Sequence, residues 1–139
     1  MSTSTICLTS NAKEVPPNIS SFREAKKLAA DIFKDHRTTF YCGCSFNQKG
    51  LVNRSICGYS PRKNKKRGKH IEWEHVVPAH ALGHSRQCWR EPESFAECRK
   101  SSGKVYRGRK CCNKVDPVFR AMTSDLNNLV PAVFLYVLK

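Results

Sequence analysis

Eight cysteines in a chain of 139 residues restrict the fold more than any other feature of this sequence. They are Cys7, Cys42, Cys44, Cys57, Cys88, Cys98, Cys111 and Cys112. Such a density in a small domain is typical of an oxidising compartment and a disulfide framework. The alternative is a zinc site, but neither Cys42-x-Cys44 nor Cys111-Cys112 has the spacer that lets paired thiolates share zinc, and no histidine pair follows in order. Disulfides are therefore the favoured interpretation.

Composition does not choose the pairs, because eight cysteines permit roughly a hundred connectivities. Cys42 and Cys44 cannot easily bond to each other, since so short a ring strains a disulfide. Each is expected to have a different partner, and Cys57 is the nearest candidate.

The chain carries a large positive charge. Lysine and arginine total 25, aspartate and glutamate total 11, and the formal net charge is +14. This excess favours a polyanionic partner, such as DNA, RNA or an anionic membrane surface, although a solvated basic face is the alternative. No stretch is long enough to span a bilayer, since the apolar run at residues 129–138 is about half the required length.

One α+β domain is expected from the order of the predicted elements. Residues 1–19 are predicted to be a flexible polar tail. Ser21 and Glu24 form a capping-box pattern at the start of a helix over residues 21–36. Its apolar residues recur at helical spacing and are expected to face the core. They are Phe22, Ala25, Leu28, Ala29, Ile32 and Phe33.

Five further segments have local patterns. Residues 38–42 are β-branched and aromatic, which predicts a short strand. Residues 60–69 are predicted to be a basic loop, and residues 90–114 a charged loop that faces phosphate or solvent. Asp116 and Pro117 have the types preferred at the N-cap and first position of a helix, which is expected to end near residue 125. Residues 129–132 are predicted to form a strand.

The stretch at residues 71–77 is predicted to be a strand that carries chemistry. Glu72 and Glu74 are candidate metal ligands beside His75, a candidate general base, and next to phosphate-attracting charge, and this combination suggests a nuclease. Strand alternation puts the Glu74 and His75 side chains on opposite faces, so a shared site requires a twisted or bulged strand end before Pro78. A hydrogen-bonded core histidine is the alternative interpretation of His75. His80 and His84 would share a helix face, but no carboxylate lies between them at helical spacing, which makes a metal site there weak.

Several blocks of the sequence resemble the bacterial endonuclease I family of periplasmic and secreted nucleases, which have the ββα-metal (His-Me finger) fold. The resemblance runs from about residue 20 to residue 133. Its blocks are Phe40-Tyr41-Cys42-Gly43-Cys44, Cys57-Gly58-Tyr59, Glu72-Trp73-Glu74-His75-Val76-Val77-Pro78-Ala79, Gly83-His84, Arg86-Gln87-Cys88-Trp89, Gly108-Arg109-Lys110 and Asp125-Leu126-Asn127-Asn128-Leu129-Val130-Pro131-Ala132.

The resemblance implies a role for each matching residue. His75 would be the general base, Glu74 would bind one Mg²⁺ ion, and Arg109 would bind the scissile phosphate. Asn128 would tie the two strands of the motif together through backbone hydrogen bonds. The remaining basic residues would supply affinity for DNA and RNA backbones without sequence preference. They are Arg62, Lys63, Lys65, Lys66, Arg67, Lys69 and Lys110.

The sequence also departs from the family pattern. The second strand of the motif is expected to lead into a helix that carries an asparagine ligand of the metal, but the expected Gly-Glu-Val-Asn-Gly-Asp run is absent after residue 133. Residues 20–139 are therefore interpreted as the N-terminal part of the family domain, with the fold incomplete at this helix. Within the resemblance, Cys88 and Cys112 are an expected pair. Cys98 and Cys111 depart from the pattern and are a candidate pair.

The predicted function is an Mg²⁺-dependent, nonspecific endonuclease that leaves 5′-phosphate ends on DNA and RNA. The alternative is an inactive cationic remnant that only binds nucleic acid. A membrane-active cationic protein would leave Glu74 and His75 unexplained. No obligate protein partner is predicted, although the apolar C-terminal tail could promote self-association. Family and cysteine content predict a periplasmic or secreted protein, but residues 1–10 show no export signal.

Overall fold

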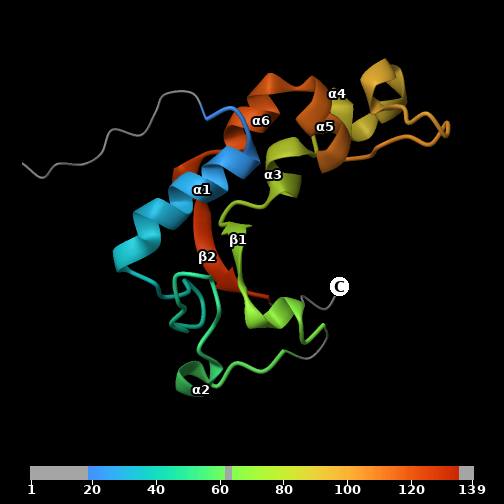
Figure 1. The fold of residues 1–139 in the computed structure, drawn as a ribbon. Helices are drawn as coiled ribbons and strands as arrows, with labels where there is room; N and C mark the ends of the chain where they lie inside the picture. Colours follow the sequence, from blue (N-terminus) through green and yellow to red (C-terminus); the bar gives the residue numbers. More distant parts are fainter. Residues whose placement is uncertain (1–18, 62–63, 135–139) are drawn as a thin grey trace, which may run out of the picture.

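The fold is a mixed α+β arrangement around one pair of strands (Figure 1). The computed structural model describes residues 19–61 and 64–134, so nearly all of the predicted tail at residues 1–19 lies outside the described residues. The α-helices are α1 Phe22–Ile32, α2 Arg54–Cys57, α3 Ala79–Gly83, α4 Gln87–Arg90, α5 Arg109–Val115 and α6 Pro117–Thr123. The 3₁₀ turns are Phe33–Asp35, Arg67–Lys69, Pro92–Ser94, Ala96–Cys98 and Leu126–Asn128. The strands are β1 Ile71–His75 and β2 Leu129–Val133.

The two strands form an antiparallel pair in which Ile71 lies opposite Val133 and His75 opposite Leu129. Every residue of β2 is buried, which agrees with its unbroken apolar sequence. Pro131 has no N–H to donate, but its carbonyl oxygen accepts the N–H of Phe40 at 2.8 Å on the other edge of the strand. The strands predicted for residues 71–77 and 129–132 are confirmed, and β1 ends two residues earlier than expected.

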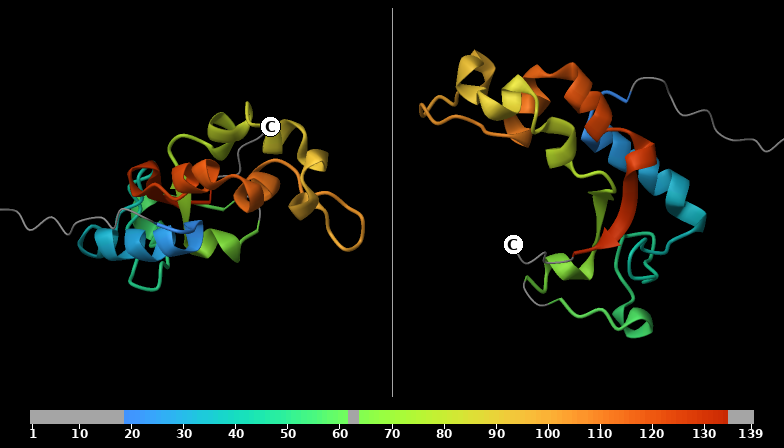
Figure 2. Two further views of the ribbon diagram at one scale, coloured as in Figure 1. Left: turned by 90° about the horizontal axis from the view of Figure 1, so that it is seen from above. Right: turned by 180° about the vertical axis from the view of Figure 1, so that it is seen from behind.

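Helix α1 packs along one side of this pair (Figures 1 and 2). Ser21 caps the helix by accepting the Glu24 N–H, and Ala25 and Ala29 are buried. The Glu24 carboxylate bonds the N–H and hydroxyl of Ser20, one residue before the partner of a standard capping box. The helix predicted for residues 21–36 is confirmed, with a 3₁₀ turn as its last part. Ile32 is an exception to the predicted core face, since 55% of it is exposed.

The strand predicted for residues 38–42 is wrong, because this segment turns back on itself. Thr38 makes only an isolated bridge with Ser45. The Thr39 N–H bonds the Cys44 carbonyl, and the Thr39 hydroxyl accepts the Cys44 N–H, both at 2.9 Å. Gly43 adopts a φ of +60°, which the turn requires. A side-chain hydroxyl and a glycine therefore override the β propensity of the aromatic residues here.

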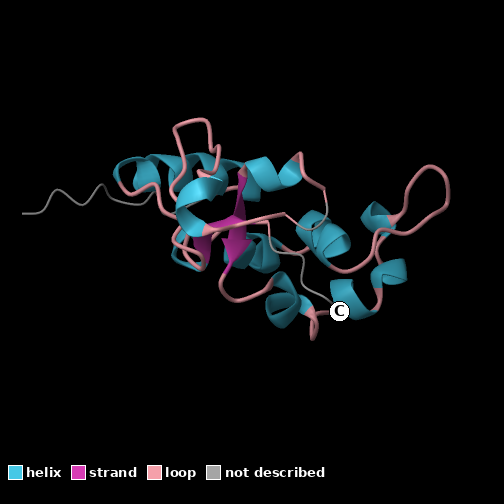
Figure 3. Cartoon of the chain, turned by 90° about the horizontal axis from the view of Figure 1, so that it is seen from below, coloured by secondary structure: helices cyan, strands magenta, loops and turns pink. Residues whose placement is uncertain are grey.

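Helices α3 to α6 form a lobe beyond the end of β1, on the side away from the turn at residues 46–50 (Figure 1). Loops join the short helices of the fold (Figure 3). Its core contains Phe119 and four buried cysteines: Cys88, Cys98, Cys111 and Cys112. Gly83 allows close packing, because a Cβ there would lie 2.4 Å from the Trp89 ring. Asp116 caps α6 by accepting the Phe119 N–H at 2.8 Å, as predicted. The loop predicted for residues 90–114 is wrong at its end, where α5 begins at Arg109.

Three disulfides stabilise the fold and confirm the predicted framework. They join Cys44 to Cys57, Cys88 to Cys112 and Cys98 to Cys111. Among the described residues Cys42 is free and exposed, and Cys7 lies outside them. The apolar residues Leu129–Val133 are buried as β2, whereas residues 135–139 of the predicted self-association tail lie outside the described residues. No described helix has the length and apolar character of a membrane span.

Candidate active site

His75 is the last residue of β1, at the junction between the strand pair and the helical lobe. Its Nε2 atom lies 2.8 Å from the backbone carbonyl oxygen of Thr123, at the end of α6. A carbonyl oxygen can only accept a hydrogen bond, so Nε2 must carry the proton. In the neutral imidazole the lone pair is therefore on Nδ1. The fold fixes the tautomer that leaves Nδ1 able to accept a proton.

An aromatic ring from α1 holds the imidazole from a second direction. The Phe22 ring stacks on His75, with centroids 5.1 Å apart and planes 23° apart. The guanidinium carbon of Arg109 lies 4.9 Å from the centroid of the same Phe22 ring. Phe22 was expected only to fill the core, and nothing in its spacing indicates that it would touch His75. Three segments distant in the sequence thus meet at one ring.

The surroundings of His75 favour its neutral form. Partial burial lowers the pKa of the imidazole below its ordinary value, and the nearby Arg109 charge lowers it further. The hydrogen bond to Thr123 opposes these effects, because it stabilises the protonated ring. The net pKa is lowered, so His75 is neutral at physiological pH. A neutral imidazole with a free Nδ1 can act as a base.

Glu74 carries the nearest carboxylate, and its side chain is exposed. Neighbouring protein atoms exclude water from the Glu74 carboxylate and raise its pKa, and the Glu72 carboxylate on the same face of β1 raises this pKa further. Positive charges on Arg67 and Arg109 act in the opposite direction. The Glu72 carboxylate forms an ion pair with Arg67, whose Nη2 lies 2.7 Å from Glu72 Oε2. Glu74 therefore remains the available anionic oxygen ligand.

Glu74 is a single carboxylate that could take part in holding a metal ion. Magnesium in proteins commonly keeps several waters and uses one or two carboxylates together with substrate phosphates. Within residues 19–61 and 64–134, no group of three or more histidine, cysteine, aspartate or glutamate side chains could enclose a metal. His80 and His84, the weak metal pair, stack with ring centroids 5.1 Å apart. Glu74 with water and phosphate is thus the arrangement that the residues allow.

Arg109 opens helix α5 and is partly buried. It lies close enough to lower the pKa of both Glu74 and His75. The preceding Gly108 has a φ of +52°, and a Cβ at this position would lie 3.2 Å from the Trp89 indole. Glycine is therefore needed for the chain to turn against Trp89 and bring Arg109 to the site. The exposed Lys110 follows directly.

Asn128 connects the start of β2 to the segment that follows His75. Its Oδ1 accepts the Val77 N–H at 2.6 Å, and its Nδ2 donates to the Val77 carbonyl oxygen at 3.0 Å. The Asn128 backbone carbonyl also accepts the Val76 N–H at 3.0 Å. These three bonds fix the bend after β1, where the strand alternation ends.

The basic run lies at the other end of β1. Lys65, Lys66 and Lys69 are exposed, whereas residues 62–63, which include the predicted Arg62 and Lys63, lie outside the described residues. Arg67 is bonded to Glu72 and lies 4.1 Å from the centroid of the Phe134 ring, so its charge is engaged within the protein. Arg109 thus lies within electrostatic reach of both Glu74 and His75, and Asn128 fixes the bend that follows His75. The paired residues of β1 contain no bulge, because the register with β2 is unbroken up to His75, so Glu74 and His75 leave the strand on opposite faces. Lys65, Lys66 and Lys69 lie at the other end of β1, whereas Arg67 also acts on Glu74.

The sequence of the chain is similar to those of known proteins. The profile of the family described as Endonuclease I matches residues 17–136. An extracellular deoxyribonuclease of Aeromonas hydrophila is 40% identical over 122 residues, which cover 86% of this chain and 47% of that protein. Endonuclease-1 of Buchnera aphidicola subsp. Acyrthosiphon pisum is 40% identical over 118 residues, covering 83% and 41%. A periplasmic deoxyribonuclease of Aeromonas hydrophila is 39% identical over 116 residues, covering 81% and 42%. The chain spans somewhat less than half the length of these relatives.

Proposed function

The chain belongs to the endonuclease I family, and on this basis we propose that it is an Mg²⁺-dependent endonuclease that cleaves DNA and RNA without sequence preference. The observation that carries the proposal is the hydrogen bond from His75 Nε2 to the Thr123 carbonyl, which puts the lone pair of the neutral ring on Nδ1, in the residue that follows Glu74 and lies within electrostatic reach of Arg109. The deoxyribonuclease names of the relatives support DNA as a substrate. The proposal includes RNA because phosphate contacts carry no base information.

The chain's own residues would act in sequence on one phosphate. Arg109 would bind the phosphate oxygens, since its planar donors match their geometry. His75 Nδ1 would take a proton from the attacking water as the new P–O bond forms. Breaking the bond to the 3′ oxygen would leave a 5′-phosphate and a 3′-hydroxyl. Phe22 and Thr123 would keep the imidazole oriented during this transfer.

Glu74 would hold the magnesium ion. When bound, the ion would neutralise charge that develops on the phosphate and on the leaving oxygen. The exposure of Glu74 supports this role, because its carboxylate is accessible while the neighbouring Glu72 is paired with Arg67.

The proposed fold of the site is the ββα-metal motif. Its supporting features are an antiparallel pair with Glu74 and His75 at the end of the first strand and Asn128 just before the second. The motif's helix would follow β2, and residues 135–139 lie outside the described residues. We also propose that the chain works in the periplasm or outside the cell, since relatives are named periplasmic and extracellular and the fold contains three disulfides.

The products of cleavage test this function. Supercoiled plasmid nicked by the oxidised protein in Mg²⁺ should be resealed by DNA ligase, which requires a 5′-phosphate next to a 3′-hydroxyl. A labelled RNA of mixed sequence should be cut at many positions. Nicks that ligase cannot seal until a kinase has added a 5′-phosphate would contradict the proposed direction of bond breaking.

A second candidate is a cationic protein that binds nucleic acid without cutting it. The observation that favours it is the single carboxylate available for metal among the described residues, together with the net charge of +14. Such a protein would shift nucleic acid in gels, with an affinity that falls as salt rises, and would leave plasmid intact.

The rate of cleavage should rise with pH through the titration of His75. The base must be neutral, and its pKa is lowered below the ordinary value of about 6.5, so the acidic limb of kcat/KM should lie below pH 6.5. Replacing Arg109 by glutamine removes a nearby positive charge and should move this limb to higher pH. A limb above pH 7 in the wild type, or no shift in the variant, would argue against His75 as the base.

Replacing Glu74 by glutamine should lower the cleavage rate at about 1 mM Mg²⁺ by about 100-fold or more, because a neutral amide binds magnesium weakly. Higher Mg²⁺ should restore part of the rate, which a purely structural defect would not allow. Glu97→Gln is a matched control, since Glu97 is exposed in the helical lobe. Equal rates for Glu74→Gln and Glu97→Gln would remove Glu74 from the metal site.

A further inference from the structure

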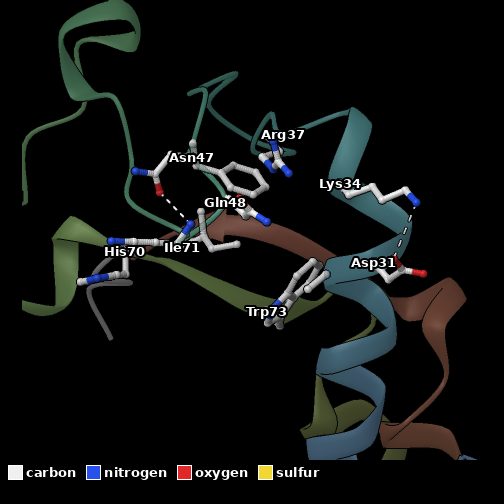
Figure 4. A pocket seen from close by; sticks show the side chains of 12 residues that line it. Asp31, Lys34, Arg37, Asn47, Gln48, His70, Ile71 and Trp73 are labelled. Atoms are coloured by element: carbon white, nitrogen blue, oxygen red, sulfur yellow. Dashed lines mark hydrogen bonds and ion pairs between the residues drawn. The ribbon is translucent and has the colours of Figure 1, made fainter.

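A cavity of about 530 Å³ lies between the end of α1, the turn at residues 46–50 and the start of β1 (Figure 4). Positive charge dominates its walls. Lys34 comes from the 3₁₀ turn that follows α1, Arg37 comes from the segment after that turn, and Lys49 comes from the turn at residues 46–50. Asp31 is the one carboxylate among the described lining residues, and it pairs with Lys34 at 3.9 Å. Three permanent cations against one carboxylate favour an anionic ligand.

Aromatic side chains line the same cavity. Trp73 lies at its edge and is held there by Phe33, whose ring centroid is 5.7 Å from that of the indole. Phe46 contributes a second ring. Cations combined with aromatic faces are typical of sites that bind single-stranded nucleic acid, where unstacked bases lie on rings and phosphates on basic groups.

Backbone hydrogen bonds hold the cavity in shape without a ligand. The Phe46 N–H bonds the Arg37 carbonyl at 3.0 Å, and the Ile71 N–H bonds the Gly50 carbonyl at 2.9 Å. Asn47 Oδ1 accepts the N–H groups of Lys49 and Leu51 at 2.9 and 3.0 Å, which closes the turn. The cations therefore extend from a fixed frame, which reduces the entropy lost on binding.

The cavity and the candidate active site lie along the same strand. Trp73 and His75 are alternate residues of β1, so they share a face and lie about 7 Å apart along the strand. A stacked strand rises about 3.4 Å per nucleotide and an unstacked strand extends further, so this separation corresponds to one or at most two nucleotides. Phe22 stacks on His75 and the Phe33 ring lies against Trp73, so a strand that occupied both places would pass around α1.

We propose that this cavity is a strand-binding subsite that takes one nucleotide of single-stranded DNA or RNA, with the base against Trp73 and Phe46 and the phosphate on Lys34, Arg37 and Lys49. The proposal rests on the proposed nuclease function and adds a binding position outside the Glu74–His75 site. It gives the enzyme a preference for unpaired strands, because a base within a duplex cannot reach the rings.

The test is binding of a fluorescein-labelled oligothymidylate of about ten nucleotides, and of the matching oligouridylate, in EDTA at low salt. The variant Lys34→Gln/Arg37→Gln/Lys49→Gln should lose at least about tenfold in affinity. The control Arg23→Gln/Lys27→Gln/Lys104→Gln removes the same charge from exposed positions and should lose less than about threefold.

Tryptophan fluorescence supplies a second readout. The chain has two tryptophans, so Trp73→Phe leaves only Trp89, while a ring remains in the cavity. The oligonucleotide should quench the emission of the wild type and of the control, but not that of Trp73→Phe. Circular dichroism melting of each variant checks that the fold is retained.

Different results would overturn different parts of the account. Equal loss of affinity in the cavity and control variants, with no quenching from Trp73, would overturn the subsite. The same cavity-specific loss with a duplex probe would overturn the preference for unpaired strands. No binding by the wild type at low salt would contradict the proposed function itself and, with it, the subsite.

Discussion

Replacement of His75 by alanine is expected to lower the rate of phosphodiester cleavage by about 10²–10⁴-fold. The Thr123 carbonyl fixes the proton on Nε2, and partial burial with the Arg109 charge keeps the ring neutral. Removing the imidazole would leave water without a base at the phosphate. Binding of nucleic acid should change by less than about threefold, because His75 is uncharged at neutral pH and phosphate contacts come from other residues.

The control for this prediction is His84→Ala. His84 is exposed, and its ring stacks on His80 in the helical lobe. Its replacement should leave the rate within about twofold of the wild type, as expected for a surface substitution. Cleavage by His75→Ala within tenfold of the wild type, with its melting temperature unchanged, would exclude His75 as the base.

Removal of the Cys88–Cys112 disulfide is expected to lower the free energy of unfolding by about 2–5 kcal/mol. Both cysteines are buried in the core of the helical lobe, and they are separated by 24 positions in the sequence. Closing a loop of that length in the unfolded chain corresponds to about 3 kcal/mol. Activity should fall as well, since Cys112 belongs to α5, whose first residue is Arg109.

The double variant Cys88→Ala/Cys112→Ala should therefore melt several degrees below the wild type in a denaturation experiment followed by circular dichroism. Cys42→Ala is the matched control, because Cys42 is exposed and free among the described residues. It should change the free energy of unfolding by less than about 0.5 kcal/mol. Equal stability of the two variants would show that the disulfide does not support the lobe.

Local patterns predicted the elements whose signals lie within a few residues. The cap at Asp116, the start of α1 at Ser21 and the unbroken apolar run of β2 each gave the observed element. The strand predicted for residues 38–42 was wrong because the hydrogen bond from the Cys44 N–H to the Thr39 hydroxyl overrides β propensity. Helix α5 was not predicted because its sequence is basic and cysteine-rich. Its buried face is set by two disulfides whose partner cysteines are too far away in the sequence to give a local pattern.

The sequence indicated candidate site residues but not their contacts. The motif indicated Glu74, His75, Arg109 and Asn128, whose roles remain proposals, and the structure adds that Arg109 acts on both Glu74 and His75. The packing of Phe22 on His75 was not predictable, since it joins a helix to a strand about fifty positions away with no local signal. The ion pair between Arg67 and Glu72 was likewise not predictable, because a basic run in a sequence does not show which of its charges pair within the protein.

The most direct test of the proposed function is the metal dependence of plasmid nicking by the oxidised protein. The site built from Glu74, His75 and Arg109 predicts that supercoiled plasmid is converted to the open circular form in Mg²⁺ and stays intact in EDTA. Plasmid that stays intact in both conditions, while still binding the protein with an affinity that falls as salt rises, would contradict the nuclease and favour the binding-only alternative.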